Sequence, residues 1–95
     1  MADFTVRVEL HQGTWTDYET LHAAMEQKGF SRVITASDGR TYQLPLAEYN
    51  GSSGTLNCAQ IRDIARAAAA TTGKGNGVLV SESVSRAWVG LAQTN

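Results

Sequence analysis

A few residues of this chain have the types and positions suited to acid–base and phosphate chemistry. His11 follows an alternating apolar and polar segment, and Arg40 and Tyr42 come directly after a polar turn. Cleaving RNA without a metal needs a base near the ribose 2′-hydroxyl and a cation near the phosphate, roles that imidazole and guanidinium groups fill. We therefore name His11, Arg40 and Tyr42 as candidate catalytic residues. The alternative is that all three are ordinary surface or packing side chains.

Four basic residues are candidates for holding RNA phosphates: Arg7, Arg32, Arg40 and Lys74. Arg40 stands out because it lies at the tip of the turn, where a guanidinium group can hold a phosphate through two hydrogen bonds. The chain has 8 basic and 9 acidic side chains and a net charge of −1. This balance excludes a surface that grips long nucleic acid through many phosphates, so we expect local RNA contacts and no DNA partner.

No metal or cofactor is expected, because the carboxylates show no ligand spacing and Asp38 is explained by its turn. Residues 72–77, TGKGNG, place Lys74 between glycines, but a phosphate-binding Walker loop would be preceded by a strand and followed by a helix. The single Cys58 cannot form an internal disulfide, and the first ten residues lack a signal-peptide pattern. We therefore expect a cytoplasmic protein, and no stretch is apolar enough to span a membrane.

The first half of the chain predicts a strand, a helix and a hairpin. Apolar and polar residues alternate over residues 3–11, the pattern of a strand with one buried face. Thr16 and Glu19 have the spacing of a capping box, which predicts a helix over residues 17–28, with His22 as a packed or half-exposed residue of that helix. Asp38-Gly39 predicts a two-residue hairpin turn. This turn predicts three facing pairs, which are Ser37 with Arg40, Thr35 with Tyr42, and Val33 with Leu44.

The second half predicts a loop, a helix and a further strand. Residues 50–54, NGSSG, read as a loop, and Asn57 with Gln60 predicts a capped helix over residues 58–71. Residues 77–83 read as a strand, which residues 86–93 extend or follow with a short extra strand.

The predicted order of elements is β-α-β-β-α-β. This order is typical of α+β ferredoxin-like folds, in which one antiparallel sheet carries two helices on one face. We expect one such domain over residues 1–95. A chain of this length buries a modest core, and we therefore also expect a homodimer.

Several stretches carry a family resemblance: FTVRVELHQGTWTDYETLHAAMEQKGFSRVI, DGRTYQLPLAEY, the Ala-rich helix and VLVSES. Together they resemble the GhoS-like family, the endoribonuclease antitoxins of type V toxin–antitoxin systems, over nearly the whole chain. The resemblance implies a ferredoxin-like fold similar to CRISPR-associated small endoribonucleases, and cleavage of a toxin messenger RNA. No catalytic residue carries over, because those nucleases place an aspartate near the end of the first strand, where this chain reads Glu9-Leu10-His11.

A second function class stays open beside the nuclease. Ferredoxin-like sheets that bind single-stranded RNA stack bases on aromatic side chains, and the polar side of the first predicted strand has none. A neutral chain with a polar sheet face is also what a non-catalytic homodimeric interaction or regulatory protein would have.

Overall fold

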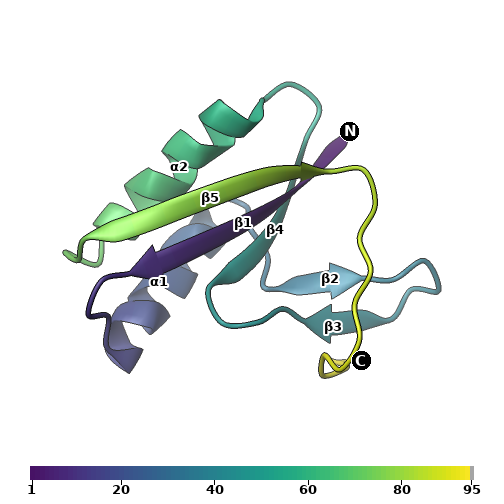
Figure 1. Ribbon diagram of the computed structural model, residues 1–95, viewed down its shortest axis with the longest axis horizontal. Coiled ribbons are helices and arrows are strands. Elements are labelled where there is room, and N and C mark those ends of the chain that lie inside the picture. Colours follow the sequence, from purple (N-terminus) through teal and green to yellow (C-terminus); the bar gives the residue numbers. More distant parts are fainter. Residues whose placement is uncertain (95) are drawn as a thin grey trace.

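The computed structural model describes residues 1–94, which form five strands and two helices. In chain order these are β1 (Ala2–Leu10), α1 (Trp15–Gln27), β2 (Val33–Thr35), β3 (Thr41–Gln43), β4 (Glu48–Ser53), α2 (Cys58–Ala70) and β5 (Asn76–Ser83) (Figure 1). The fold is α+β, as the sequence predicts. The order of strands and helices is roughly consistent with a ferredoxin-like fold.

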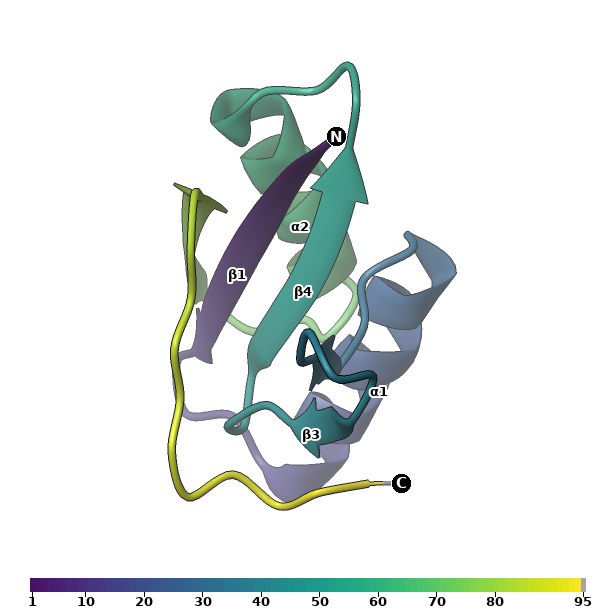
Figure 2. The same ribbon diagram turned by 90° about the vertical axis from the view of Figure 1, so that its right-hand side faces the viewer.

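β1 is the central strand of a three-stranded antiparallel sheet with the order β4-β1-β5. The alternation in its sequence gives it two unlike faces, one apolar and one polar. Both helices cover the apolar face, and neither helix lies on the polar face, which we call the open face (Figure 2). The apolar residues of β1 and the residues packed on them form the core: Phe4, Val6, Val8, Leu10, Leu21, Met25, Phe30, Tyr49, Ile61, Ala65, Ala68 and Ala69.

The predicted single sheet is divided into two in the structure. Ser31 and Asn50 exchange backbone hydrogen bonds of 2.8 and 2.7 Å, and this bridge occupies the place of a fourth strand beside β4. Beyond it, β2 and β3 form a separate two-stranded hairpin that extends away from the helices (Figure 1). Pro45 and Ala47, the latter with a φ of 64°, lie in the bend between β3 and β4, where proline has no N–H to donate to a ladder.

The predicted register of the hairpin is wrong by one residue. The observed partners are Val33 with Gln43, Ile34 with Tyr42, and Thr35 with Thr41. The turn is a three-residue loop, in which Gly39 has a φ of 89° and the Ala36 N–H donates to the carbonyl of Arg40. Such a loop, with glycine in the left-handed region, is the next most common hairpin connection after the two-residue turn. A slip of one residue changes which side chains share a face, and Ile34, which is buried, shares its face with Tyr42.

Two other local predictions are corrected. The N-cap of α1 is Thr14, not Thr16, because the Asp17 N–H donates to the Thr14 hydroxyl and the Thr14 N–H donates to the Asp17 carboxylate. β4 includes most of the predicted loop at residues 50–54. Gly51 lies inside this strand because Phe30 packs against it, and a Cβ at Gly51 would lie 2.9 Å from the Phe30 ring. The Asn57–Gln60 capping box of α2 is confirmed.

The segment from residue 84 to 94 does not extend β5 as a strand. It returns along the open side of the sheet, where Arg86 donates a 2.7 Å hydrogen bond to the side chain of Asn50. Further on, the Gln43 N–H donates to the carbonyl of Ala92, and a single bridge joins Tyr42 to Gln93. The predicted extra strand is therefore reduced to one bridge on β3. Within residues 1–94, neither helix is long and apolar enough to cross a bilayer.

Candidate functional site

The end of β1 places His11 at an exposed corner of the molecule. The His11 N–H donates a 2.8 Å hydrogen bond to the carbonyl of Gly75, which continues the β1–β5 ladder by one pair. The imidazole Nε2 lies 3.6 Å from the Glu9 carboxylate. Gly75 leaves room for the ring, because a Cβ there would lie 3.0 Å from His11 Nδ1. The ladder therefore brings the loop before β5 against the imidazole.

The same loop carries Lys74, whose ammonium lies 3.7 Å from the carboxylate of Asp17. Asp17 is fixed by the start of α1, since its Oδ2 accepts a 2.9 Å hydrogen bond from the Thr14 N–H. This backbone hydrogen bond, together with the charge of Lys74, lowers the pKa of Asp17. The ammonium of Lys74 is thus held where β1 ends and α1 begins. We call Arg7, Glu9, His11, Asp17 and Lys74 the His11 corner.

Arg7 joins this corner through the open face of the sheet. It lies two residues before Glu9 on β1, so both side chains point to the open side. A shallow hollow of about 350 Å³ is lined by these two residues and by the start of β5 at residues 77–79. A cation and a carboxylate therefore border an open surface that leads toward His11.

The other predicted site residues lie elsewhere. Arg40 is at the tip of the hairpin, with its Nε 3.7 Å from Asp38, and Tyr42 packs edge-on against Trp88 with ring centroids 5.7 Å apart. Arg32 comes just before β2. The hairpin and the end of β1 lie on opposite sides of the molecule (Figure 1). The six residues therefore form two groups: Arg7, His11 and Lys74 at the His11 corner, and Arg32, Arg40 and Tyr42 around the hairpin.

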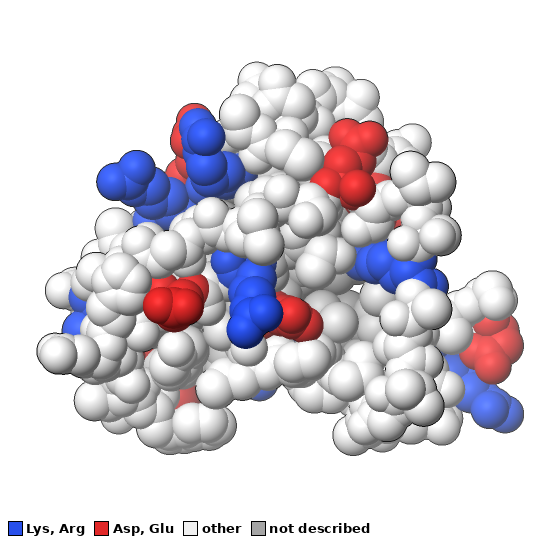
Figure 3. All heavy atoms as spheres, in the orientation of Figure 1, with Lys and Arg blue, Asp and Glu red and all other residues white. Residues whose placement is uncertain are grey.

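Charges of both signs are mixed over the open face of the sheet. Figure 3 shows basic and acidic side chains interspersed there, with no broad basic patch. A small surface such as the His11 corner fits this pattern better than an extended groove for nucleic acid. Among residues 1–94, no group of three or more histidine, cysteine or carboxylate side chains is placed to hold a metal ion.

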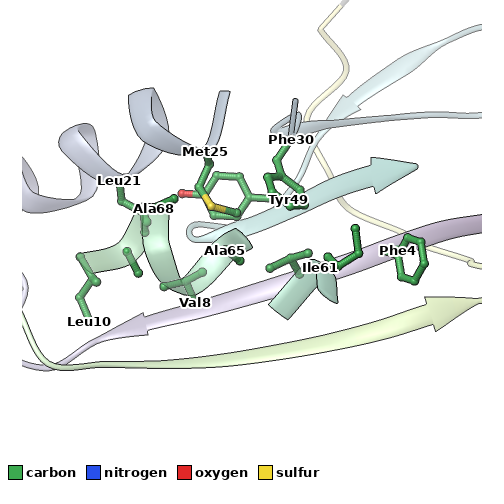
Figure 4. Packing of buried hydrophobic residues seen from close by; sticks show 12 residues of the cluster. Phe4, Val8, Leu10, Leu21, Met25, Phe30, Tyr49, Ile61, Ala65 and Ala68 are labelled. Atoms are coloured by element: carbon green, nitrogen blue, oxygen red, sulfur yellow. The ribbon is translucent and has the colours of Figure 1, made fainter. Parts of the chain in front are cut away.

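A buried histidine–tyrosine pair was only half foreseen from the sequence. His22 is a packed residue of α1, as expected, but its partner on β4 is not visible in the helical pattern. His22 Nδ1 lies 2.6 Å from the hydroxyl of Tyr49, whose ring belongs to the core and points its oxygen toward α1 (Figure 4). Burial raises the pKa of the Tyr49 hydroxyl well above its ordinary value. The imidazole Nε2 is buried with no hydrogen-bond partner in the described part of the chain.

Burial also lowers the pKa of His22 below its ordinary value of 6.5. Arg32 adds to this effect, whereas Glu26 and Glu19 oppose it. A buried neutral imidazole that bonds a core tyrosine serves packing rather than catalysis at the surface.

Arg86 is the other polar residue that sequence reasoning missed. Its guanidinium reaches the side chain of Asn50, 36 positions away, and no local pattern gives such a pairing. It fixes the start of the C-terminal segment against the open face of the sheet. Searches against family models and against curated proteins found no match to this chain.

Proposed function

We propose that this protein is an RNA-cleaving antitoxin of the GhoS-like kind, which acts on a toxin messenger RNA in the cytoplasm. One observation carries the proposal: an exposed imidazole lies beside a carboxylate and next to a loop that bears a lysine, at the His11 corner. The sequence resemblance supplies the class of substrate. The corner supplies the groups that strand cleavage needs.

His11 acts as the general base in this proposal. It takes the proton of a ribose 2′-hydroxyl, and the 2′-oxygen forms a bond to the neighbouring phosphorus while the bond to the 5′-oxygen breaks. The leaving 5′-oxygen takes a proton from solvent water. Glu9 lies beside the imidazole, with its carboxylate 3.6 Å from Nε2. Lys74 and Arg7 neutralise the phosphate in the transition state. The products are a 2′,3′-cyclic phosphate and a 5′-hydroxyl, and no metal takes part.

The first test is to incubate the purified protein with total RNA, with and without a divalent-ion chelator, and to map new RNA ends by sequencing. The proposal predicts discrete new ends that carry 5′-hydroxyl groups and persist in the chelator. Ends that carry 5′-phosphate and vanish with the chelator would overturn the assignment to His11, because such ends indicate a metal-activated water.

Two matched lysine variants show whether the activity belongs to this corner. Lys74→Ala is expected to slow cleavage by about 10-fold or more, since it removes a cation from the phosphate. Lys28→Ala changes an exposed lysine at the C-terminal end of α1 and is expected to leave the rate unchanged. Equal rates for both variants would remove Lys74 from the site.

The second candidate is a non-catalytic homodimeric interaction or regulatory protein. It is favoured by the separation of the six predicted site residues into two groups, because no single phosphate can be held by both. If no new RNA ends form at high protein concentration, this second function takes the place of the nuclease.

A further inference from the structure

The free edge of β5 has no partner in the described chain. β5 is the last strand of the order β4-β1-β5, and it is eight residues long. In an antiparallel ladder, hydrogen-bonded pairs alternate with non-hydrogen-bonded pairs. His11 and Gly75 are a hydrogen-bonded pair, so every second residue of β5 from Gly75 onward points its backbone groups toward β1. The residues whose backbone groups point away from β1 are therefore Asn76, Val78, Val80 and Glu82.

This edge lacks the usual features that prevent pairing with another chain. Natural edge strands are protected by lysine, proline, bulges or a covering segment. β5 contains no lysine or proline, pairs with β1 without a bulge, and has one charged residue, Glu82. Apolar groups flank it on both sides. Leu79 is 65% exposed on the open face, and a hollow on the helix side is lined by Val78, Val80 and residues of α2.

We propose that β5 pairs antiparallel with β5 of a second copy of this chain, with Leu79 opposite Leu79. In this register each Val78 lies opposite Val80 of the second copy, and each Asn76 lies opposite Glu82. Those last two pairs are the hydrogen-bonded ones, and they use the backbone groups that point away from β1. No like charges face each other, and apolar residues meet on both faces.

A second copy fits this edge because the strand is complementary to itself. A twofold axis through Leu79 repeats each contact, as an isologous dimer requires. A register centred on Val80 would instead set each Val78 against the carboxylate of Glu82. The net charge of −1 gives little repulsion between copies. In the Leu79 register the helices lie on the same side, so the two open faces form one continuous surface of six strands.

Sedimentation over a concentration series tests the dimer. The wild-type protein is expected to approach twice its 10.2 kDa mass at high concentration. Leu79→Lys places two ammonium groups opposite each other and is expected to give a monomer with unchanged far-ultraviolet circular dichroism. Leu46→Lys, at another exposed leucine, is expected to leave the dimer intact. A wild-type monomer at all concentrations, or a dimer that Leu79→Lys does not weaken, would overturn the proposal.

A cross-linking experiment tests the register itself in a Cys58→Ser background. Directly opposite residues of a non-hydrogen-bonded pair have Cα atoms about 4.5 Å apart, which suits a disulfide. Leu79→Cys is therefore expected to form a covalent dimer on mild oxidation. Ser81→Cys lies on the same face two residues along, but its twin lies too far away to react. Equal cross-linking of both variants would contradict the register. Neither outcome depends on RNA cleavage, so the dimer and the nuclease are tested separately.

Discussion

The three-stranded sheet and the β2–β3 hairpin show two ways in which one chain holds its polar residues. The sheet has a central strand whose apolar face is buried under both helices, so its polar face is positioned by a continuous core. The hairpin has strands of three residues each, and it is held by the C-terminal segment and by a few side chains such as Ile34 and Leu44. A site that needs fixed geometry belongs on the sheet, because a group on a rigid element is positioned more precisely than one on a loop.

Two leucine-to-alanine variants compare how much side-chain packing in each region contributes to stability, and the first of them is expected to have the largest effect on stability. Leu21 in α1 is completely buried in the core of the sheet, whereas Leu44, 9% exposed, belongs to the hairpin region. Leu21→Ala is expected to lower the free energy of unfolding by about 4 kcal/mol, because the tightly packed core cannot close the cavity. Leu44→Ala is expected to cost about 2 kcal/mol, since the small cluster around it can collapse. Urea unfolding measures both, and an equal or larger loss for Leu44→Ala would contradict the comparison.

The His22–Tyr49 pair joins α1 to the sheet, and its removal is expected to have a medium effect. Tyr49→Phe leaves His22 Nδ1 buried without its partner and is expected to cost about 1–3 kcal/mol of unfolding free energy at pH 7. The folded-state pKa of His22 is lowered, so the unfolded chain binds a proton more readily than the folded one. The stability from this group is therefore fully present above about pH 6.5 and is lost as the pH falls toward the folded-state pKa.

Urea unfolding at a series of pH values checks this sign. The wild-type protein is expected to lose more stability between pH 7.5 and pH 5 than His22→Gln, which cannot titrate there. If the wild-type protein instead gains stability relative to His22→Gln as the pH falls from 7.5 to 5, the folded protein stabilises the charged imidazole, and the account of His22 is wrong.

The smallest expected effect concerns the start of α1. Thr14→Ala removes the N-cap and is expected to lower the free energy of unfolding by about 1 kcal/mol. Thr16→Ala lies within the first turn, where its side chain is exposed, and is expected to change stability by less than about 0.5 kcal/mol. Thermal unfolding of the two variants decides the point. A larger loss of stability for Thr16→Ala than for Thr14→Ala would show that Thr16, the residue predicted from the sequence, is the N-cap.

Local patterns predicted most of the fold, because several elements are specified by short-range chemistry. The alternation of β1, the cap at Asn57 and the apolar stripe of α2 each depend on residues a few positions apart. The hairpin register was missed because Asp38-Gly39 fits both a two-residue and a three-residue turn. Residues 50–53 of β4 were missed because Gly51 reads as a loop residue, whereas the Phe30 ring is what requires a glycine there.

The candidate site could be predicted only in part, because its geometry depends on contacts that are distant in the sequence. His11 could be named from its position at the end of a strand. Its proximity to the Lys74 loop follows from the pairing of β1 with β5, which no local pattern contains. Arg40 was named from its turn alone, and the fold places that turn away from His11.

The most direct test of the account compares cleavage rates between the two regions at one mapped RNA site. His11→Ala is expected to reduce the rate by about 100-fold or more, the usual loss when a general base is removed. Arg40→Ala, which removes the exposed cation at the tip of the hairpin, is expected to retain nearly the full rate. Both variants should keep the wild-type circular dichroism. Full activity in His11→Ala, or a comparable loss in Arg40→Ala, would contradict the claim that the His11 corner on the sheet carries the chemistry.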